Sequence, residues 1–445
     1  MKAVVLSALP GSHPLPLVSA VEAELGRAGY QGVTTFPLAE TKLAYCQGEF
    51  DCWVKTPGQC RVVDEEVAIV QAIHDADALV LLGPLTFGGH GFVMKRALDR
   101  MICLLEPFFT TRSALTHHEV RYRQPPKFFA IAIADEANAD EVETFVALTE
   151  ANALNYLSPT WGAVVLDTTR PETWAAALSG MLRSTRSPGA EIRDRAELRS
   201  QLLGAATPAP GLGPTPIRTA ALLVGSPKIK GSSASEQMAR ALAKKLEAAG
   251  VQTQLHFASE FVHDNELTQE RAQAIAAQQL FVLVTPLYID SYPSLTIHAL
   301  EQIERARGEA HAPAHFVLII NCGFPEPEHN RTAIRQARIF SAQSGYAYGG
   351  ALPLGGGGVL TPDQDLEQAR GPVLHIAQAL TLAAATLPHS GAVSPEAIEK
   401  MMTSPLPDVL YRLVGNLGWR WQAFENGLTQ RSLRARPLDP PPATS

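Results

Sequence analysis

The chain has 445 residues, 46% of them hydrophobic, and a formal net charge of −7. This length suits about two to four domains, and the apolar content gives each half enough material for its own core. Because no cluster of Lys and Arg stands out, the acidic balance argues against nucleic-acid and anionic-membrane binding, and no apolar run reaches transmembrane length. The N-terminus reads as a strand and not as a signal peptide, and the five cysteines are an odd number, which predicts a protein of the reducing cytoplasm. We therefore expect small-molecule chemistry.

Strands and helices alternate through the first half. We expect strands at 3–8, 33–36, 79–83, 128–134 and 163–167, and helices at 18–28, 65–74 and 140–156. A continuous apolar run that leads directly into a helix is typical of a parallel strand buried on both faces. The alternation predicts right-handed crossovers in a doubly wound sheet.

The second half repeats this order. Residues 83–101 and 285–303 align without a gap. Each segment begins at the last residue of an apolar strand and continues into Pro-Leu. We expect strands at 219–225, 251–257, 281–285, 315–321 and 347–354, and helices at 233–249 and 268–278. The predicted fold class is α/β, with two tandem doubly wound domains, each with a five-stranded parallel sheet, plus C-terminal helices.

A stretch rich in Pro, Gly and Ala separates the halves and suits an extended linker. The predicted boundaries are a first domain at 1–205, the linker at 206–217, a second domain at 218–390 and a C-terminal helical extension at 391–445. We expect Trp419, Trp421 and Phe424 of this extension to pack down as a lid or brace, and residues from 437 onward to be disordered.

The loop after the first strand of the second half has the composition of an anion site. Main-chain N–H groups at the start of the next helix, a lysine and several hydroxyls could together bind a phosphate. The residues are Ser226, Lys228, Ser232, Ser233 and Ser235. The alternative is that Ser233 and Glu236 only form a capping box. The equivalent loop at 9–14 contains prolines and is a poorer phosphate site.

Further loops are candidates because open parallel sheets bind ligands beyond the carboxyl ends of their strands. In the second half they are the turn of Pro286, Leu287, Tyr288 and Ile289 and the strand end of Asn321, Gly323 and Phe324. In the first half the equivalent turn is a second candidate site, formed by Pro84, Leu85, Thr86, Phe87 and Gly88.

The serine-rich loop from Gly225 to Lys228 and beyond, the turn at 285–288 and the strand order resemble the flavodoxin-like NAD(P)H-dependent FMN reductases, here in tandem duplication. The first half is similar, more narrowly, to iron-sulfur-flavoprotein-like members, through the loop from Cys46 to Cys60, Asp64 and the turn at 83–89. The resemblance covers nearly all of both halves. It implies flavodoxin-like domains, FMN as cofactor, NAD(P)H as electron donor and a small-molecule electron acceptor.

The cysteine motif of the first half is incomplete. Glu49 stands where relatives with a cluster carry a second cysteine, and three thiols remain, Cys46, Cys52 and Cys60. Because a four-iron cluster usually needs four thiolates, we expect neither an iron-sulfur cluster nor another metal site. The cysteines are interpreted as remnants, structural thiols or a redox-sensitive pair.

The densest polar cluster lies on the connection before strand 128–134, where we expect an exposed loop at the ligand end of the sheet. A cationic or phenolic side chain there could stabilise the negative charge of a reduced flavin. The candidates for this catalytic role are His117, His118, Arg121 and Tyr122. The alternative is a docking segment against the second domain.

The first hypothesis is an FMN-dependent NAD(P)H oxidoreductase that reduces a quinone, a nitro compound or a similar small acceptor. The flavin site would lie in the second domain and be walled by the first, so that the chain acts as an intramolecular pseudo-dimer, and a homodimer could form as well. The alternatives are an electron-transfer flavoprotein with a protein partner and a non-catalytic flavodoxin-like binding or scaffold protein.

Overall fold

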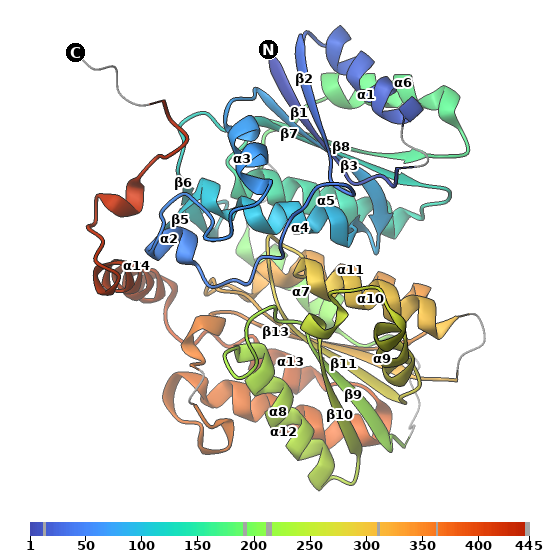
Figure 1. Cartoon of the computed structure of the whole chain (residues 1–445). Helices are drawn as coiled ribbons and strands as arrows, with labels where there is room; N and C mark the ends of the chain where they lie inside the picture. Colours follow the sequence, from blue (N-terminus) through green and yellow to red (C-terminus); the bar gives the residue numbers. More distant parts are fainter. Residues whose placement is uncertain (12–14, 190–193, 211–215, 309–311, 362–363, 441–445) are drawn as a thin grey trace. The chain divides into compact units, whose positions relative to one another are not determined.

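The computed structural model describes residues 1–11, 15–189, 194–210, 216–308, 312–361 and 364–440. The chain forms two compact units, a first unit of residues 1–193 with 412–445 and a second unit of residues 194–411 (Figure 1). These boundaries differ from the predicted ones at both ends of the second domain. Helix α7 (Arg195–Ala206) already belongs to the second unit, and the last 34 residues return to the first. Part of the expected linker, residues 211–215, lies outside the described residues.

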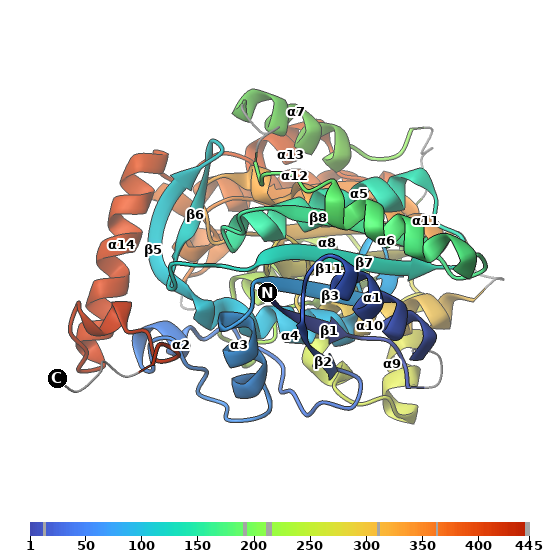
Figure 2. The ribbon, with the colours of Figure 1, turned by 90° about the horizontal axis from the view of Figure 1, so that it is seen from above.

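The first unit is built on a parallel sheet with the order β2-β1-β3-β7-β8. Figure 2 shows these strands next to one another. Its strands are β1 (Lys2–Ser7), β2 (Gly32–Pro37), β3 (Ala78–Thr86), β7 (Lys127–Ala134) and β8 (Trp161–Asp167). The short strand β4 (Gly89–His90) pairs antiparallel with the end of β3. Leu79–Leu82 are at most 1% exposed, so the continuous apolar run in the sequence is a strand buried on both faces.

Helices cover both faces of this sheet (Figure 1). One face carries α1 (Leu15–Arg27) and α6 (Trp174–Arg183), which share a core cluster with the strands. The other face carries α3 (Glu66–His74), α4 (Phe92–Arg100) and α5 (Ala139–Asn155). A hairpin of β5 (Leu105–Arg112) and β6 (Leu115–Val120) and the short helix α2 (Asp51–Val54) complete the N-terminal part.

The second unit repeats the strand order as β10-β9-β11-β12-β13, with all pairings parallel. The strands are β9 (Thr219–Val224), β10 (Gln252–Phe257), β11 (Leu280–Pro286), β12 (His315–Asn321) and β13 (Ala347–Leu354). The helices are α7, α8 (Ala234–Ala248), α9 (Glu266–Ala276), α10 (Ser294–Arg307), α11 (Arg331–Gln343), α12 (Leu374–Ser390) and α13 (Pro395–Met401). The predicted fold class, two doubly wound domains with five-stranded parallel sheets, is confirmed.

The C-terminal segment is only partly the brace that we expected. Helix α14 (Asp408–Glu425) places Trp419 edge-on against Phe50 and Trp53, with ring centroids 5.4 and 5.3 Å away. Trp421 and Phe424, however, are 63% and 71% exposed, so the expectation that they pack down is wrong. No helix among the described residues combines the length and the hydropathy of a membrane span.

The predicted disorder from residue 437 is also wrong for the described part of the tail. Asp439 contacts His74 at 3.1 Å, and Leu438 N–H donates to the Tyr122 hydroxyl at 3.3 Å. Residues 441–445 lie outside the described residues.

Candidate active site

The candidate site lies at the carboxyl edge of the second sheet, where β9, β11 and β12 are neighbours. The strand that follows β9 in the chain lies on one side of it and β11 on the other, so the crossovers diverge beside β9. Ligands of doubly wound sheets bind at such a switch point. Three predicted loops therefore meet at one edge.

The first loop turns sharply at the end of β9. The Thr296 hydroxyl donates to the Gly225 carbonyl at 2.6 Å, and a Cβ on Gly225 would lie 2.5 Å from Thr285 Oγ1. Only glycine fits this approach. Further along, Gly231 has a φ of +87°, which favours glycine as the chain turns into α8.

Two serines of this loop use their hydroxyl oxygens as acceptors. Ser226 Oγ accepts from Lys228 N–H at 3.4 Å, and Ser233 Oγ accepts from Glu236 N–H at 3.1 Å, which caps α8. A hydroxyl has one proton and two lone pairs. Both serines are buried, and the bonds described for them do not use their protons, so each can still donate to a ligand.

The other two serines spend their protons within the protein. Ser232 donates to the Ile229 carbonyl at 2.5 Å, and Ser235 donates to Asn321 Oδ1 at 3.0 Å. The first bond closes the loop on itself, and the second ties the start of α8 to the end of β12. These two hydroxyls stabilise the loop, and their protons are already donated within the protein.

The charges around the loop are largely paired. The Glu236 carboxylate is 2% exposed, accepts from Gly231 N–H and binds Arg240 at 2.7 Å. Lys230 binds Glu260 at 2.8 Å, and Lys228 lies half-buried within the loop. The predicted capping box is thus half present. The Ser233 hydroxyl accepts from Glu236 N–H and caps α8, but the Glu236 carboxylate accepts from Gly231 N–H and not from Ser233 N–H.

The second loop follows β11. Leu287 N–H donates to the Asn321 carbonyl at 2.8 Å, and Tyr288 bridges to Ser291. Ile289 and Asp290 have φ values of 49° and 58°, a left-handed conformation that costs these side chains of order 1–2 kcal/mol each. Pro286, Leu287, Tyr288 and Ile289 remain half-buried at the sheet edge, as a loop that touches a ligand would be.

The third loop, after β12, is fixed from behind. Tyr411 donates its hydroxyl proton to the Gly323 carbonyl at 2.9 Å, and the Phe324 ring lies 4.7 Å from the His329 ring. Gly323 is exposed, and apart from its chain neighbours no described residue has an atom within 4 Å of the position that its Cβ would take. Burial raises the pKa of the neighbouring Cys322 thiol to about 12, so this cysteine stays protonated.

The equivalent edge of the first sheet differs. The second candidate site, Pro84 to Gly88, folds back on itself because Leu85 and Thr86 pair with β4. Phe87 is 4% exposed at a φ of 50°. Residues 12–14 of the loop after β1 lie outside the described residues.

The histidine-rich segment is not the exposed loop at the ligand end that the sequence predicted. Residues 115–120 form strand β6, and His117 Nδ1 lies 2.8 Å from Asn155 Oδ1 at the end of α5. Arg121 and Tyr122 follow β6, and Tyr122 lines a pocket with Leu79 and Phe128, near the amino ends of β3 and β7. In a parallel sheet this is the edge opposite the ligand loops. The polar run misled because its burial depends on partners far away in sequence.

Arg121 is fully buried by such partners. Its guanidinium donates to the carbonyls of Cys103, Leu105, Leu433 and Ala435 at 2.7–3.0 Å. Burial lowers the pKa of Arg121, and the nearby Glu106 opposes the shift. His118 is half-buried, with Nδ1 3.1 Å from the Pro107 carbonyl and its ring 4.5 Å from that of Trp53.

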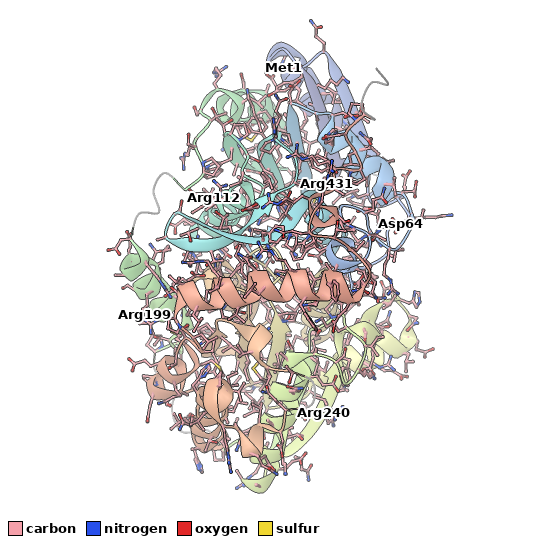
Figure 3. All side chains as sticks on the ribbon, turned by 90° about the vertical axis from the view of Figure 1, so that its left-hand side faces the viewer. Met1, Asp64, Arg112, Arg199, Arg240 and Arg431 are labelled. Atoms are coloured by element: carbon pink, nitrogen blue, oxygen red, sulfur yellow. The ribbon has the colours of Figure 1, made fainter. Side chains whose placement is uncertain are left out.

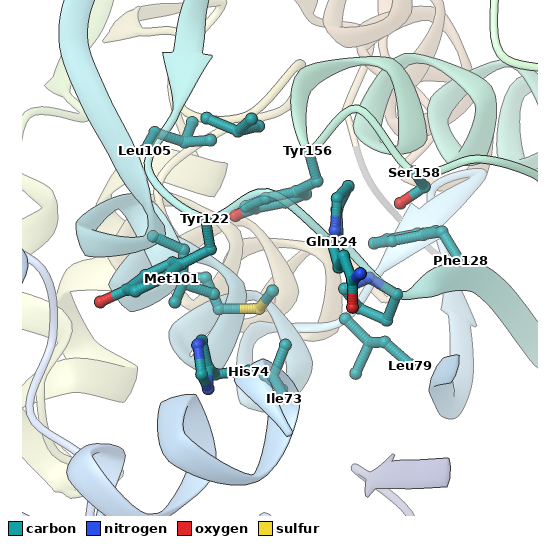
Figure 4. A pocket seen from close by; sticks show the side chains of 14 residues that line it. Ile73, His74, Leu79, Met101, Leu105, Tyr122, Gln124, Phe128, Tyr156 and Ser158 are labelled. Carbon is teal, nitrogen blue, oxygen red and sulfur yellow. The ribbon is translucent and has the colours of Figure 1, made fainter. Parts of the chain in front are cut away.

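A mainly apolar pocket opens beside Tyr122 (Figure 4). Its walls come from α3, the start of β5 and the amino ends of β3 and β7. His74 and Met101 face Tyr122 across it. Sequence reasoning missed the pocket because its walls come from separate segments with no common motif.

The three loop cysteines are in the first unit as free thiols. Burial raises the pKa of Cys46 to about 12 and also raises that of Cys52 and Cys60. Within the described residues, no group of three or more His, Cys, Asp or Glu side chains is placed to hold a metal ion.

Residues 218–350, which include four strands of the second sheet and the first half of the fifth, match the family of NADPH-dependent FMN reductases. No curated protein matches the chain. Among solved structures, an NAD(P)H:quinone oxidoreductase from Methanothermobacter marburgensis is 14% identical, with a TM-score of 0.31 over 38% of this chain and 99% of that chain. An FMN-dependent NADH-azoreductase from Bacillus anthracis str. Ames Ancestor, in complex with FMN, is 12% identical, with a TM-score of 0.28 over 38% and 99%.

Because these identities and TM-scores are low, the functional assignment rests on the family match and on the site itself. The match supports the predicted flavin-dependent oxidoreductase with FMN as cofactor and NAD(P)H as electron donor.

Proposed function

We propose that the chain is an FMN-dependent NAD(P)H oxidoreductase whose flavin binds at the carboxyl edge of the second sheet. The observation that carries the proposal is the pair of buried hydroxyls of Ser226, just after β9, and Ser233, at the start of α8, because the bonds described for them do not use their protons. The site lies within the residues that match the reductase family. Bound FMN would supply the redox chemistry, since it accepts hydride from NAD(P)H and passes electrons on to a small acceptor such as a quinone or a nitro compound.

The residues present fit a phosphate group. The first N–H groups of α8 have no partner within the helix, and its N-terminus carries partial positive charge. Ser226 and Ser233 add two neutral donors, and Lys228 adds a cation to the same loop. Arg240 pairs with Glu236 and Lys230 pairs with Glu260, so each of these carboxylates near the loop has a cationic partner.

The two further loops would hold the flavin ring. Half-buried Leu287, Tyr288 and Ile289 would form one side, and Phe324 would offer an aromatic surface on another. Asn321, at the end of β12, connects the third loop to the other two. Its carbonyl accepts from Leu287 N–H in the second loop, and its side chain accepts from Ser235 at the end of the first. A displacement at any of the three loops would therefore reach the other two.

We also propose that the two units arose by duplication. Both sheets have the same strand order. The turn after the third strand contains two successive residues with positive φ in each unit, Phe87 and Gly88 in the first and Ile289 and Asp290 in the second. The similarity of the first half to iron-sulfur-flavoprotein-like members remains a prediction that rests on the cysteine loop.

Two finer expectations stay predictions. One is that the first unit walls the flavin site. The other is that His117, His118, Arg121 and Tyr122 act in catalysis. The burial of His117, Arg121 and Tyr122 weighs against this role.

The proposal is tested on the purified full chain by its absorption spectrum, by flavin and iron content per chain and by NAD(P)H oxidation with a quinone. We expect bound FMN and turnover. Bound flavin without turnover would favour the electron-transfer flavoprotein, and the absence of FMN binding would favour a scaffold protein.

A further inference from the structure

Most of the large hydrophobic side chains that are exposed in the described part of the chain lie on one helix, α14, which Figure 3 shows along its length. Six of them follow one stripe: Leu410, Leu413, Val414, Leu417, Trp421 and Phe424, with exposed fractions from 43% to 71%. A packed surface helix turns its apolar side inward. α14 carries apolar residues outward as well.

The opposite side of α14 is already occupied. Ala423 is buried in a cluster with Phe108 and Leu433, and Asn416 Oδ1 accepts from Phe109 N–H at 2.8 Å. A Cβ on Gly415 would lie 2.4 Å from the Phe109 ring, so the helix rests closely on β5. Residues 415, 416, 419 and 423 form this seated face, and the exposed stripe lies on the other side of the helix.

The stripe has the spacing of a helix-pairing seam. Leu410, Val414, Leu417, Trp421 and Phe424 succeed one another by four, three, four and three residues, which is the alternation of d and a positions over two heptads. Leu413 broadens the seam on one side.

The area of the stripe matches a protein interface. From their exposed fractions, the six side chains present roughly 700 Å² of accessible surface, more than the ~300–600 Å² of the largest apolar patch on a typical monomer. A standard interface buries about 800 Å² on each partner. The net charge of −7 disfavours an anionic membrane as the occupant.

We propose that α14 pairs with α14 of a second copy of this chain, in a two-fold symmetric contact. Leu417 is the middle residue of the stripe from Leu410 to Phe424, so it meets its own counterpart whether the helices run parallel or antiparallel. The stripe lies outside residues 218–350 that match the reductase family, and the proposal is independent of the proposed function.

The test is the mass of the purified full chain by sedimentation velocity over a range of concentrations. We expect a dimer for the wild type and monomers for Leu417→Glu and Leu417→Lys at the same concentration, with a dimer dissociation constant raised at least about tenfold. An equimolar mixture of the two variants should recover the dimer mass, because Glu and Lys then face each other. Gln422→Glu adds the same charge to an exposed position off the stripe and should leave the dimer intact.

Two results would overturn the proposal. One is a wild type that stays monomeric at the highest concentration, including one that instead co-sediments with phosphatidylcholine vesicles. The other is a dimer that persists in both Leu417 variants. Unchanged thermal unfolding and flavin content of the variants would show that the substitutions act on association and not on folding.

Discussion

The two polar segments that stand out in the sequence, 117–122 and 225–235, use their hydrogen-bonding groups in opposite ways. Arg121 donates to four main-chain carbonyls of its own unit. Ser226 and Ser233 accept bonds and keep their protons for a further partner. The first segment is denser in charge, and the second lies at the ligand edge of its sheet. The comparison teaches that donor capacity left over after folding is a better guide to a site than the density of polar residues.

The largest effect should come from Arg121→Ala. The exchange leaves buried carbonyls without donors, so we expect the free energy of unfolding of the first unit to fall by roughly 3–5 kcal/mol. All five tryptophans, Trp53, Trp161, Trp174, Trp419 and Trp421, lie in the first unit. Their fluorescence in a urea titration therefore reports on that unit alone.

The matched control for this prediction is Arg123→Ala, because Arg123 is exposed. It should change the free energy of unfolding by no more than about 0.5 kcal/mol. If the Arg121→Ala variant were as stable as the wild type but had lost turnover, the result would contradict this prediction and support a catalytic role for segment 117–122.

Next in size is the effect of Ser226→Asp on FMN binding. A carboxylate in place of a neutral donor would repel the phosphate, and we expect the dissociation constant of FMN to rise about a hundredfold, or roughly 2.7 kcal/mol. The measurement is a titration of flavin-free protein followed by quenching of FMN fluorescence. Ser232→Asp is the control and should cost less than about tenfold, since the Ser232 hydroxyl already serves the loop.

Because Ser226 is buried, Ser226→Ala provides a milder version that removes only the donor. Calorimetric unfolding of each variant separates lost binding from lost structure. Equal FMN retention in the folded Asp variant would place the phosphate elsewhere.

Ser233 separates capping from binding. Ser233→Ala should lower the free energy of unfolding of the second unit by about 1 kcal/mol through the lost cap, and should also weaken FMN binding. Ser233→Asp keeps an N-cap acceptor but adds a charge, so stability should recover while FMN affinity falls further. Ser233→Thr should preserve both quantities. If the Ser233→Asp variant and the wild type bind FMN with the same affinity, Ser233 acts only as a helix cap.

The smallest effect on turnover is expected for Tyr122→Phe. Its hydroxyl accepts from Leu438 N–H at 3.3 Å, and its loss should cost about 0.5–1.5 kcal/mol of stability. Burial raises the pKa of Tyr122 to about 12, so the phenol stays protonated at and above neutral pH. The pH profile of turnover between about pH 6 and 10 should therefore be the same in the variant and the wild type. If the fall or rise of turnover with pH seen in the wild type were missing in Tyr122→Phe, the Tyr122 hydroxyl would be a catalytic group.

The sequence was sufficient for the sheets because their signals are local. Apolar runs such as 79–82 and 281–284 end in turns with Pro-Leu, and strand order follows from the alternation with helices. The loop at 225–235 could be predicted for the same reason. Its hydroxyls, its glycines and its helix start all lie within eleven residues.

The remaining features depend on distant partners. The sequence Leu115–Val120 does not alternate between apolar and polar residues, and only its pairing with β5 makes it a strand. The burial of Arg121 requires Leu433 and Ala435, more than 300 residues later. The same holds for α14, whose heptad spacing is visible in the sequence but whose seated side is decided by β5.

The return of the C-terminal residues to the first unit has a consequence for the order of synthesis. Arg121 and Leu433 are 312 residues apart, and a ribosome adding about 5–20 residues per second needs roughly 15 to 60 s to span that distance. Until then the guanidinium lacks two of its four carbonyl acceptors, and Phe108 lacks its cover. The unit that is made first must therefore finish last, and a nascent chain halted near residue 410 would expose this unfinished surface to chaperones and proteases.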